Sequence, residues 1–269
     1  MNDKLIIDVG MHTGRDTEFY LKKGFKVVAV EANPELVKQG RAHFEEALSE
    51  GRLFIHDVAI ADRDGEIEFY INDQHDDWGT TSKQFASRNE GFGTTNKLTR
   101  VPCTTFQQIL KQHEIPYYLK IDIEGADMLC LEALADFDEK PRYVSIEAGL
   151  NSFEETFSEL SLMWSLGYRR FKIVNQAMNR KVKCPNPPRE GLYVDYRFDA
   201  TCSGPFGEEA PGEWMSVEET VVKYRRLLWE QKYFGAAGKL YKTPVHKLYN
   251  LFKGEKAGWY DIHAKLADD

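Results

Sequence analysis

The chain has 269 residues, of which 42% are hydrophobic and 13% aromatic, so it can bury the core of one α/β domain with an elaboration. Asp and Glu total 43 against 35 Lys and Arg, which gives a formal net charge of −8. This balance argues against a surface adapted as a whole to nucleic acid, so no nucleic-acid partner is expected.

The first residues of the sequence indicate a cytoplasmic protein. Residues 1–4 lead into an apolar strand without the charged, apolar and small-residue regions of a signal peptide. No apolar run approaches the roughly 20 residues that span a bilayer, so we expect no integral membrane segment and at most peripheral association. The four cysteines form no C-x-x-C pair, which favours reduced thiols over a disulfide framework or a zinc site.

The first fifty residues predict a β-α-β unit. An apolar run at 4–9 ends at Gly10, and a helix is expected over 17–23. A second apolar run at 26–30 precedes a helix that Pro34 can open and that continues through residue 48.

The next fifty residues carry weaker signals. A third strand begins at 53–55, and 66–71 alternates polar and apolar residues like a half-exposed hairpin strand. Residues 72–100 are polar, rich in Gly, Thr and Asn, and show little periodicity, so no regular element is expected there. Within them, 76–82 is either a loop that closes over a ligand or a mobile surface hairpin.

Helices and strands then alternate again. The expected helices are 104–113, 126–135 and 153–166, and the expected strands are 117–122, 142–147 and 170–174. Strands that alternate with helices predict an α/β fold with a doubly wound, mostly parallel sheet and right-handed crossovers.

The pattern changes after residue 175, so we expect residues 1–175 to form the core and 176–269 a C-terminal elaboration. Prolines and glycines interrupt 176–215, which we interpret as a lid or insertion. A strongly amphipathic helix is expected over 216–232. Residues 233–269 are rich in aromatic residues and lysine, which indicates a helical tail that packs on the core or forms a homo-oligomer.

Ligands of open α/β sheets bind beyond the carboxyl ends of the strands, where the strand order reverses. After the first strand, Gly10 permits a tight turn and Gly14 a close approach of ligand or helix, but the third glycine of G-x-G-x-x-G is missing. A purely structural turn explains these glycines almost equally well. Asp8 supplies the acidic neighbour that the ammonium or ribose of an amino-acid-bearing nucleoside requires.

Glu31 ends the second strand about 20 residues beyond the glycine turn, where a carboxylate can accept hydrogen bonds from both ribose hydroxyls. This position indicates an adenosine ligand and suits S-adenosylmethionine and NAD equally. Asn33, another candidate at this strand end, also suits the start of the following helix.

Lys120, Asp122 and Glu124 lie in and just beyond an otherwise apolar strand. Charges in such a place are costly unless they are paired or functional. The alternative to a functional role is an internal ion pair of Lys120 with Asp122 or Glu124 that shapes the loop.

Four segments together resemble the FkbM family of S-adenosylmethionine-dependent methyltransferases, over about residues 4–175. They are IDVGMHTG at 7–14, VEANP at 30–34, VAIAD at 58–62 followed by DG at 64–65, and LKIDIEGAD at 119–127. The resemblance implies a class I, Rossmann-like methyltransferase fold and O-methylation of sugars, polyketides or other secondary metabolites. It also implies cofactor contacts from positions in or next to these segments: Asp8, Gly10, Glu31, Asp57 and Val58, with His12, Gly14 and Asn33 as further candidates.

Methyl transfer to a hydroxyl requires a positioned acceptor and removal of its proton. Asp122 is the first candidate for the base and Glu124 the second, with Lys120 holding both ionised and Glu147 facing the acceptor after the next strand. Alternatively, Asp122, Glu124 and Glu147 bind a divalent cation such as magnesium, although no metal is predicted.

The leading hypothesis is therefore an O-methyltransferase that uses S-adenosylmethionine and acts on a small molecule or glycan. One rival is an NAD-dependent oxidoreductase or epimerase, which the incomplete glycine fingerprint and the absence of a Tyr-x-x-x-Lys pair disfavour. The other is a non-catalytic binding protein on the same fold, which loss of cofactor binding would reveal.

Overall fold

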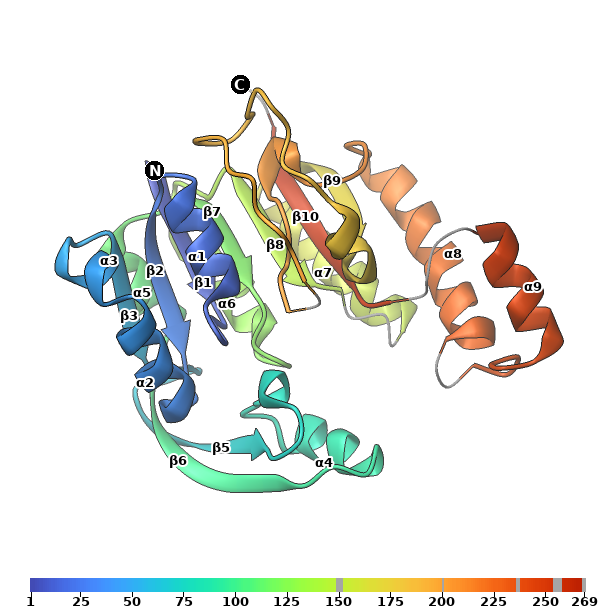
Figure 1. Ribbon diagram of the computed structural model, residues 1–269, viewed down its shortest axis with the longest axis horizontal. Coiled ribbons are helices and arrows are strands. Elements are labelled where there is room, and N and C mark those ends of the chain that lie inside the picture. Colours follow the sequence, from blue (N-terminus) through green and yellow to red (C-terminus); the bar gives the residue numbers. More distant parts are fainter. Residues whose placement is uncertain (149–151, 200, 236–237, 254–257, 268–269) are drawn as a thin grey trace.

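A seven-stranded sheet forms the centre of the protein (Figure 1). The computed structural model describes residues 1–148, 152–199, 201–235, 238–253 and 258–267. In spatial order the strands are β3 (Leu53–Asp57), β2 (Lys26–Glu31), β1 (Asn2–Val9), β7 (Pro116–Ile121), β8 (Tyr143–Glu147), β10 (Tyr260–Leu266) and β9 (Tyr168–Asn175).

The sheet is parallel except at β10, which runs antiparallel to both of its neighbours. The predicted doubly wound, mostly parallel sheet is therefore confirmed. The chain moves outward from β1 through β2 to β3 and returns to the other side of β1 as β7. The order reverses between β1 and β7, which is where such sheets bind ligands.

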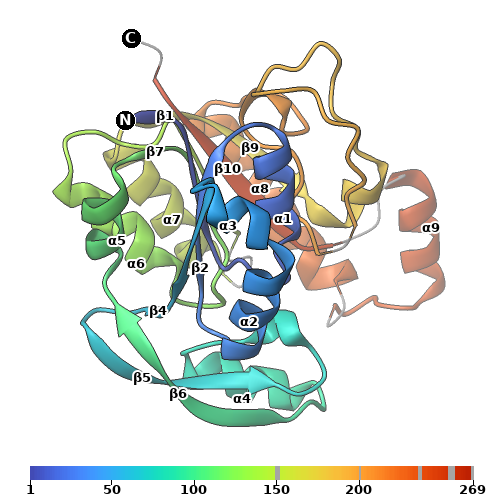
Figure 2. The same ribbon diagram turned by 60° about the vertical axis from the view of Figure 1, so that its left-hand side comes forward.

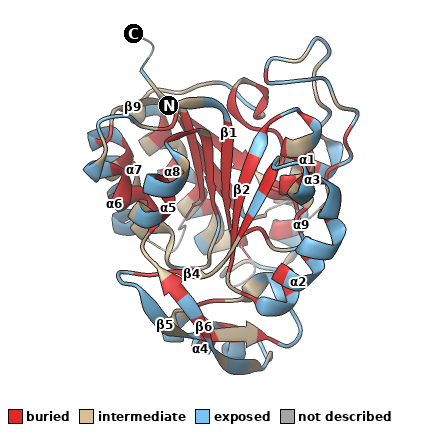
Figure 3. Cartoon of the chain, turned by 90° about the vertical axis from the view of Figure 1, so that its left-hand side faces the viewer, coloured by how far each residue is buried: buried red, intermediate tan, exposed pale blue. Residues whose placement is uncertain are grey.

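Helices cover both faces of the sheet and leave its strands buried (Figures 2 and 3). On one face lie α5 (Phe106–His113), α6 (Asp127–Ala133), α7 (Phe153–Ser165) and α8 (Val217–Phe234), whose apolar residues share one cluster with the strands. The other face is covered by α1 (Arg15–Lys22), α2 (Pro34–His43) and α3 (Glu45–Ser49). The helix expected in one piece over 34–48 is thus broken at Phe44, whose backbone is non-helical and whose ring is buried.

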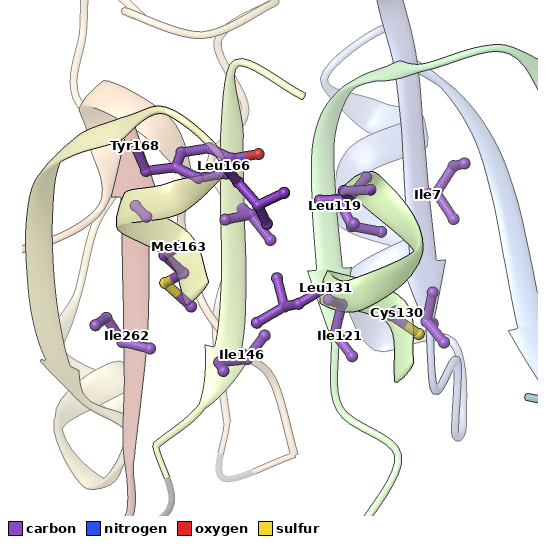
Figure 4. Close-up of a cluster of buried hydrophobic side chains, with 14 of the residues drawn as sticks. Ile7, Leu119, Ile121, Cys130, Leu131, Ile146, Met163, Leu166, Tyr168 and Ile262 are labelled. Carbon is purple, nitrogen blue, oxygen red and sulfur yellow. The ribbon is translucent and has the colours of Figure 1, made fainter. Parts of the chain in front are cut away.

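The apolar cluster that the strands share with α5, α6, α7 and α8 packs against the centre of the sheet (Figure 4). Ile7, Leu119 and Ile146 come from three adjacent parallel strands and are buried together with Leu131 of α6. Continuous apolar runs are typical of parallel strands with helices on both faces. This packing fixes the positions of the loops that follow β1, β7 and β8.

Residues 72–100 contain regular structure that the sequence analysis did not predict. A three-stranded sheet joins β4 (Ala59–Ile60), β6 (Asn96–Thr104) and β5 (Gly65–Asn72), and between its longer strands lie η1 (Asp76–Trp78) and α4 (Lys83–Gly91). The expected hairpin strand at 66–71 is confirmed as β5. Both α4 and β6 are largely exposed, so neither shows the apolar periodicity on which such predictions depend.

The segment 176–215 forms much of one wall of the core. It is irregular apart from η3 (Gln176–Lys181) and η4 (Gly207–Glu209), yet Phe206 is fully buried and stacks on Tyr118 of β7 with ring centroids 4.6 Å apart. Tyr196 and Phe198 pack on Phe19 of α1. The segment therefore takes the place of a covering helix, rather than lying over a site as a lid throughout its length.

The expected division at residue 175 does not separate the sheet from the rest of the chain. The tail was expected to be helical, but its last strand, β10, lies between β8 and β9 and pairs with both. The reason is that β10 fills the gap between two parallel strands and satisfies the backbone groups of both edges. Before it come α8, as predicted, and α9 (Pro244–Lys253), which lies at the margin of the molecule beside α8 (Figure 1).

The central position of β10 can be tested at Ile262, which is fully buried. Replacing Ile262 by Ala should lower the free energy of unfolding by about 2–5 kcal/mol, because it removes buried methyl groups and leaves a cavity. The matched control is Leu98→Ala on the exposed side of β6, expected within about 1 kcal/mol of wild type. Urea unfolding measures both, and equal effects would show that β10 does not contribute to the core.

Candidate functional site

A cavity of about 410 Å³ lies at the carboxyl ends of β1, β2, β7 and β8. Its remaining walls come from the small sheet, η1, the start of η3, residues 201–203 and the start of β10. Most of the candidate residues from the sequence line it: Gly10, His12, Glu31, Asn33, Val58, Lys120, Asp122, Glu124 and Glu147. Asp8, Gly14 and Asp57 do not line it, although each is within two residues in sequence of a residue that does.

Gly10 brings the ends of β1 and β7 into contact. Its φ of +88° is a left-handed conformation, and a Cβ there would lie 1.9 Å from the backbone oxygen of Asp122. The Asp122 N–H continues the pairing by donating to the carbonyl of Val9 at 2.9 Å. A glycine is therefore required here to bring Asp122 to the cavity.

Glu31 is fixed at the end of β2 by two backbone donors. One carboxylate oxygen accepts the N–H of His12 and the other that of Asn33, both at 2.8 Å. Burial raises the pKa of Glu31 against the lowering effect of these hydrogen bonds. Asn33 also caps α2 by accepting the N–H of Glu35, so the helix-start role expected for it is present as well. The result is a carboxylate held in one orientation at the cavity wall.

Lys120 is a buried ammonium that links β7 to β1. Its Nζ lies 3.1 Å from the Asp8 carboxylate, donates to the Gly10 carbonyl at 2.7 Å and lies 3.9 Å from Asp122. The main partner of Lys120 is thus Asp8, and neither of the loop pairs considered from the sequence is the primary one. Because Asp8 is fully buried and also accepts the Thr17 hydroxyl at 2.6 Å, it supports Lys120 from behind the cavity wall.

Asp122 and Glu124 occupy the loop after β7. The Asp122 side chain is 46% exposed, and its pKa is raised because the surrounding protein reduces its hydration, while Lys120 acts in the opposite direction. Glu124 has a φ of +51°, and its carboxylate accepts a hydrogen bond from Arg88 of α4 at 3.2 Å. Burial and the nearby Asp122 charge raise the pKa of Glu124 to about 7. Each of the two carboxyls thus has its own cationic neighbour, Lys120 for Asp122 and Arg88 for Glu124.

Glu147 faces a carboxyl that the sequence analysis missed. It is the residue opposite Asp261 in the pairing of β8 with β10, and both line the cavity. Burial, followed by the charges of Asp122 and Glu124, raises the pKa of Glu147 to about 9. The pKa of Asp261 is also raised by burial, and its carboxylate accepts a hydrogen bond from Gln176. At neutral pH Glu147 therefore holds a proton and can donate it in a hydrogen bond.

The loop around η1 lies on the cavity wall, as one of its two sequence interpretations requires. Asp76, Asp77 and Trp78 line the cavity, and the Asp76 carboxylate lies 3.1 Å from Nε2 of His12. Trp78 stacks on His75 with ring centroids 4.1 Å apart. Trp259, another residue that the sequence analysis missed, adds a second indole to the lining.

Three predicted cofactor positions do not line the cavity and make contacts that support the fold. Gly14 precedes α1 with a φ of +79°, and a Cβ there would lie 2.5 Å from the Phe44 ring. Asp57 ends β3, and its carboxylate lies 3.8 Å from Arg41. Asp8 supports Lys120, as described above. Asp8 and Asp57 are near the site because they lie at or near strand ends, but their side chains are not part of the cavity lining.

Asp16 at the start of α1 lines the cavity without having been predicted. Its carboxylate accepts the Ser203 N–H, and burial raises its pKa to about 6. Acidic residues in the first turn of a helix are common, so the sequence gave no separate signal for it. Within the described ranges, no three or more His, Cys, Asp or Glu side chains are arranged to hold a metal ion.

Comparison with known families identifies the chain. The family described as the methyltransferase FkbM domain matches residues 8–170, which include the loops after β1, β2, β7 and β8. The chain belongs to the FkbM methyltransferase family. The resemblance noted from the four sequence segments is thereby confirmed, as is the predicted enzyme class, an S-adenosylmethionine-dependent methyltransferase.

Solved structures similar to this FkbM chain are distant from it in sequence. A methyltransferase FkbM from Methylobacillus flagellatus KT is 14% identical with a TM-score of 0.42, and the match covers 64% of this chain and 40% of that protein. An S-adenosylmethionine-dependent methyltransferase from Archaeoglobus fulgidus is 11% identical with a TM-score of 0.39, over 98% of this chain and 86% of that one. No curated protein matches the chain.

The carboxyl groups of this FkbM site predict a decline of stability with pH. The pKa of Glu147 rises from 4.5 to about 9 on folding, so the folded state binds more protons between these values. The free energy of unfolding should therefore fall as pH increases from 5 to 9. In Glu147→Gln, which cannot ionise, the decline should be smaller.

Urea unfolding at several pH values between 5 and 9 measures this effect. Glu45→Gln on the exposed surface of α3 is the control and should decline as the wild type does. A decline in Glu147→Gln that equals the wild-type decline would contradict the protonation of Glu147 in the folded protein.

Proposed function

We propose that this protein transfers the methyl group of S-adenosylmethionine to a hydroxyl of a sugar, glycan or secondary metabolite. The observation that carries the proposal is that Glu31 and Asp122 line one cavity at the strand-order reversal of the sheet. The first is a fixed carboxylate suited to a ribose, and the second is an accessible carboxylate suited to a hydroxyl. Both lie within the region that matches the FkbM family.

The β2 side of the cavity fits the cofactor. Glu31 has both oxygens oriented by backbone donors and retains lone pairs for ribose hydroxyls. Val58, Ile60 and Phe69 give the same side an apolar wall that suits an adenine ring. When bound, S-adenosylmethionine supplies an electrophilic methyl group on a positively charged sulfur. The residues of this chain must then position the acceptor oxygen and remove its proton.

Asp122 is the best placed of the carboxyls to accept that proton. Burial raises the pKa of Asp122, and the Lys120 ammonium opposes this by favouring the ionised form. With pKa values of about 9 and about 7, Glu147 is protonated at neutral pH and Glu124 about half so. Asp122 would accept the proton of the acceptor hydroxyl as that oxygen becomes methylated. Glu147 and Glu124 then serve as hydrogen-bond partners of the other acceptor hydroxyls.

The acceptor side of the cavity has the composition of a sugar-binding site. The indoles of Trp78 and Trp259 provide flat apolar surfaces, and Glu124, Glu147 and Asp261 provide hydrogen-bonding groups. An acceptor with several hydroxyls and an apolar ring face matches both. This combination supports a sugar or glycan within the proposed substrate classes.

The role of Glu31 can be tested by cofactor binding. Glu31→Ala should weaken binding of S-adenosylmethionine and its demethylated product by about 1–3 kcal/mol, because charged hydrogen bonds to the ribose are lost. Isothermal titration calorimetry with both ligands and with NAD measures this, and circular dichroism confirms folding. Glu35→Ala on the exposed side of α2 is the control and should bind as wild type. Binding of NAD alone would favour the oxidoreductase, and binding of none of the ligands a non-catalytic protein.

The role of Asp122 requires a turnover measurement. A screen of sugars, polyols and phenols for formation of S-adenosylhomocysteine first identifies an acceptor. Asp122→Asn should then reduce turnover by about 10²–10⁴-fold at near-normal cofactor affinity, because the shape is kept while the base is lost. Asp62→Asn, on an exposed side chain, is the control. Full turnover in Asp122→Asn would move the proposed base to Glu124 or Glu147.

A metal-assisted reaction by Asp122, Glu124 and Glu147 is the second mechanism to be distinguished. Direct base catalysis should be indifferent to added magnesium and to a chelator, whereas metal-assisted activation should be abolished by the chelator. Both treatments are applied to the wild-type protein with the identified acceptor.

A further inference from the structure

Helix α9 carries apolar residues both where it packs on the protein and where it is exposed. One side packs on α8, where Tyr249 stacks on Phe234 with ring centroids 4.0 Å apart and His246 lies 6.0 Å from the same ring. The other side consists of Val245, Leu248 and Leu251, three residues apart, which we call the outer face of α9. An exposed group of apolar side chains on a helix marks a contact surface, which points to a partner for the outer face.

The outer face is strongly exposed. Val245 is 53% exposed, Leu248 55% and Leu251 79%, and the two views of the fold place α9 at the margin of the molecule (Figures 1 and 2). Trp229 of α8 and Tyr241 before α9 are exposed aromatic residues of the same helix pair. Tryptophan and tyrosine are enriched where proteins meet the headgroup region of a bilayer.

The charge of this part of the chain is opposite to that of the whole. Residues 231–253 contain five lysines and no Asp or Glu, in a chain of net charge −8. The lysines are Lys232, Lys239, Lys242, Lys247 and Lys253. The first four are exposed, and Lys247 lies on α9 itself, next to Leu248. An exposed apolar face beside several lysines is the pattern of helices that lie in the interface of anionic membranes.

We propose that the outer face of α9 and the exposed Lys232, Lys239, Lys242 and Lys247 dock this protein on the surface of an anionic lipid bilayer. The three apolar side chains enter the headgroup boundary, and the lysines pair with lipid phosphates. The association is peripheral, since no helix among the described residues combines the length and apolar composition needed to cross a bilayer.

A second copy of the chain is a poorer partner for this surface. In a two-fold symmetric dimer the same patch meets itself, so the lysine-rich segment of one copy would meet that of the other. Like charges across an interface are repulsive, whereas anionic headgroups neutralise all of the lysines at once. The charge pattern therefore favours lipid over self-association.

Vesicle co-sedimentation tests the proposal with the full chain and needs no methyl acceptor. The wild type should bind vesicles that contain phosphatidylglycerol, and should bind them more weakly at high salt and on vesicles of phosphatidylcholine alone. Leu248→Glu with Leu251→Glu should weaken binding by about tenfold or more, because two leucines that the bilayer would bury are lost. Lys242→Gln with Lys247→Gln should weaken it by roughly 25-fold, at about fivefold for each lysine.

Matched controls distinguish binding through this surface from nonspecific binding to vesicles. Leu98→Glu with Leu192→Glu changes two exposed leucines elsewhere, and Lys4→Gln with Lys38→Gln removes two distant lysines; both should bind vesicles as wild type. Circular dichroism and cofactor binding confirm that each variant is folded.

Several results would overturn the proposal. One is a wild-type protein that does not bind anionic vesicles, and another is vesicle binding that the α9 variants leave unchanged. A third is a wild-type dimer in analytical ultracentrifugation that Leu248→Glu converts to monomer without any vesicle binding. That last result would assign the outer face to a subunit contact instead.

Discussion

The buried ammonium of Lys120 joins the two strands between which the sheet reverses its order. It is held by the Asp8 carboxylate and the Gly10 carbonyl on β1, and it extends toward Asp122 beyond β7. A charge in such a place is tolerated only when its partners are fixed, because unpaired burial costs several kcal/mol. The same contacts that stabilise Lys120 therefore fix the two loops that form the centre of the cavity. The proposed division into a cofactor side and an acceptor side depends on this connection.

The sequence predicted those parts of the fold whose residue pattern is compatible with only one kind of element. β1, β2, β7 and β8 are apolar runs bounded by glycine, proline or charge, and a parallel sheet buried on both faces requires such runs. By contrast, α4 and β6 are largely exposed, so packing against β5 defines them more than their own pattern does. β10 escaped prediction because Asp261, His263 and Lys265 alternate with its apolar residues, so it lacks the continuous apolar run of a buried interior strand. In the structure both Asp261 and His263 are buried.

The site was predictable by one rule: a charged residue at the end of a buried strand is either paired or part of a site. That rule found Glu31, Lys120, Asp122 and Glu147, because the carboxyl ends of parallel strands meet at one edge. It also selected Asp8 and Asp57, since position along a strand does not determine which side chain points into the cavity. Asp261 could not be found in this way. It stands at the beginning of an antiparallel strand, and the amino end of such a strand lies at the same edge as the carboxyl ends of the others.

The interior position of β10 has a consequence for synthesis of the protein. The ribosome synthesises β8 and β9 about a hundred residues before residues 260–266. Both strands therefore leave the ribosome before the strand that pairs with them. Until β10 arrives, each of them presents unpaired backbone groups, a state in which strands tend to pair with other chains. A nascent or prematurely terminated chain is thus exposed to aggregation in its second half. The β1–β2–β3 half, whose strands are consecutive in the chain, completes its pairing much earlier.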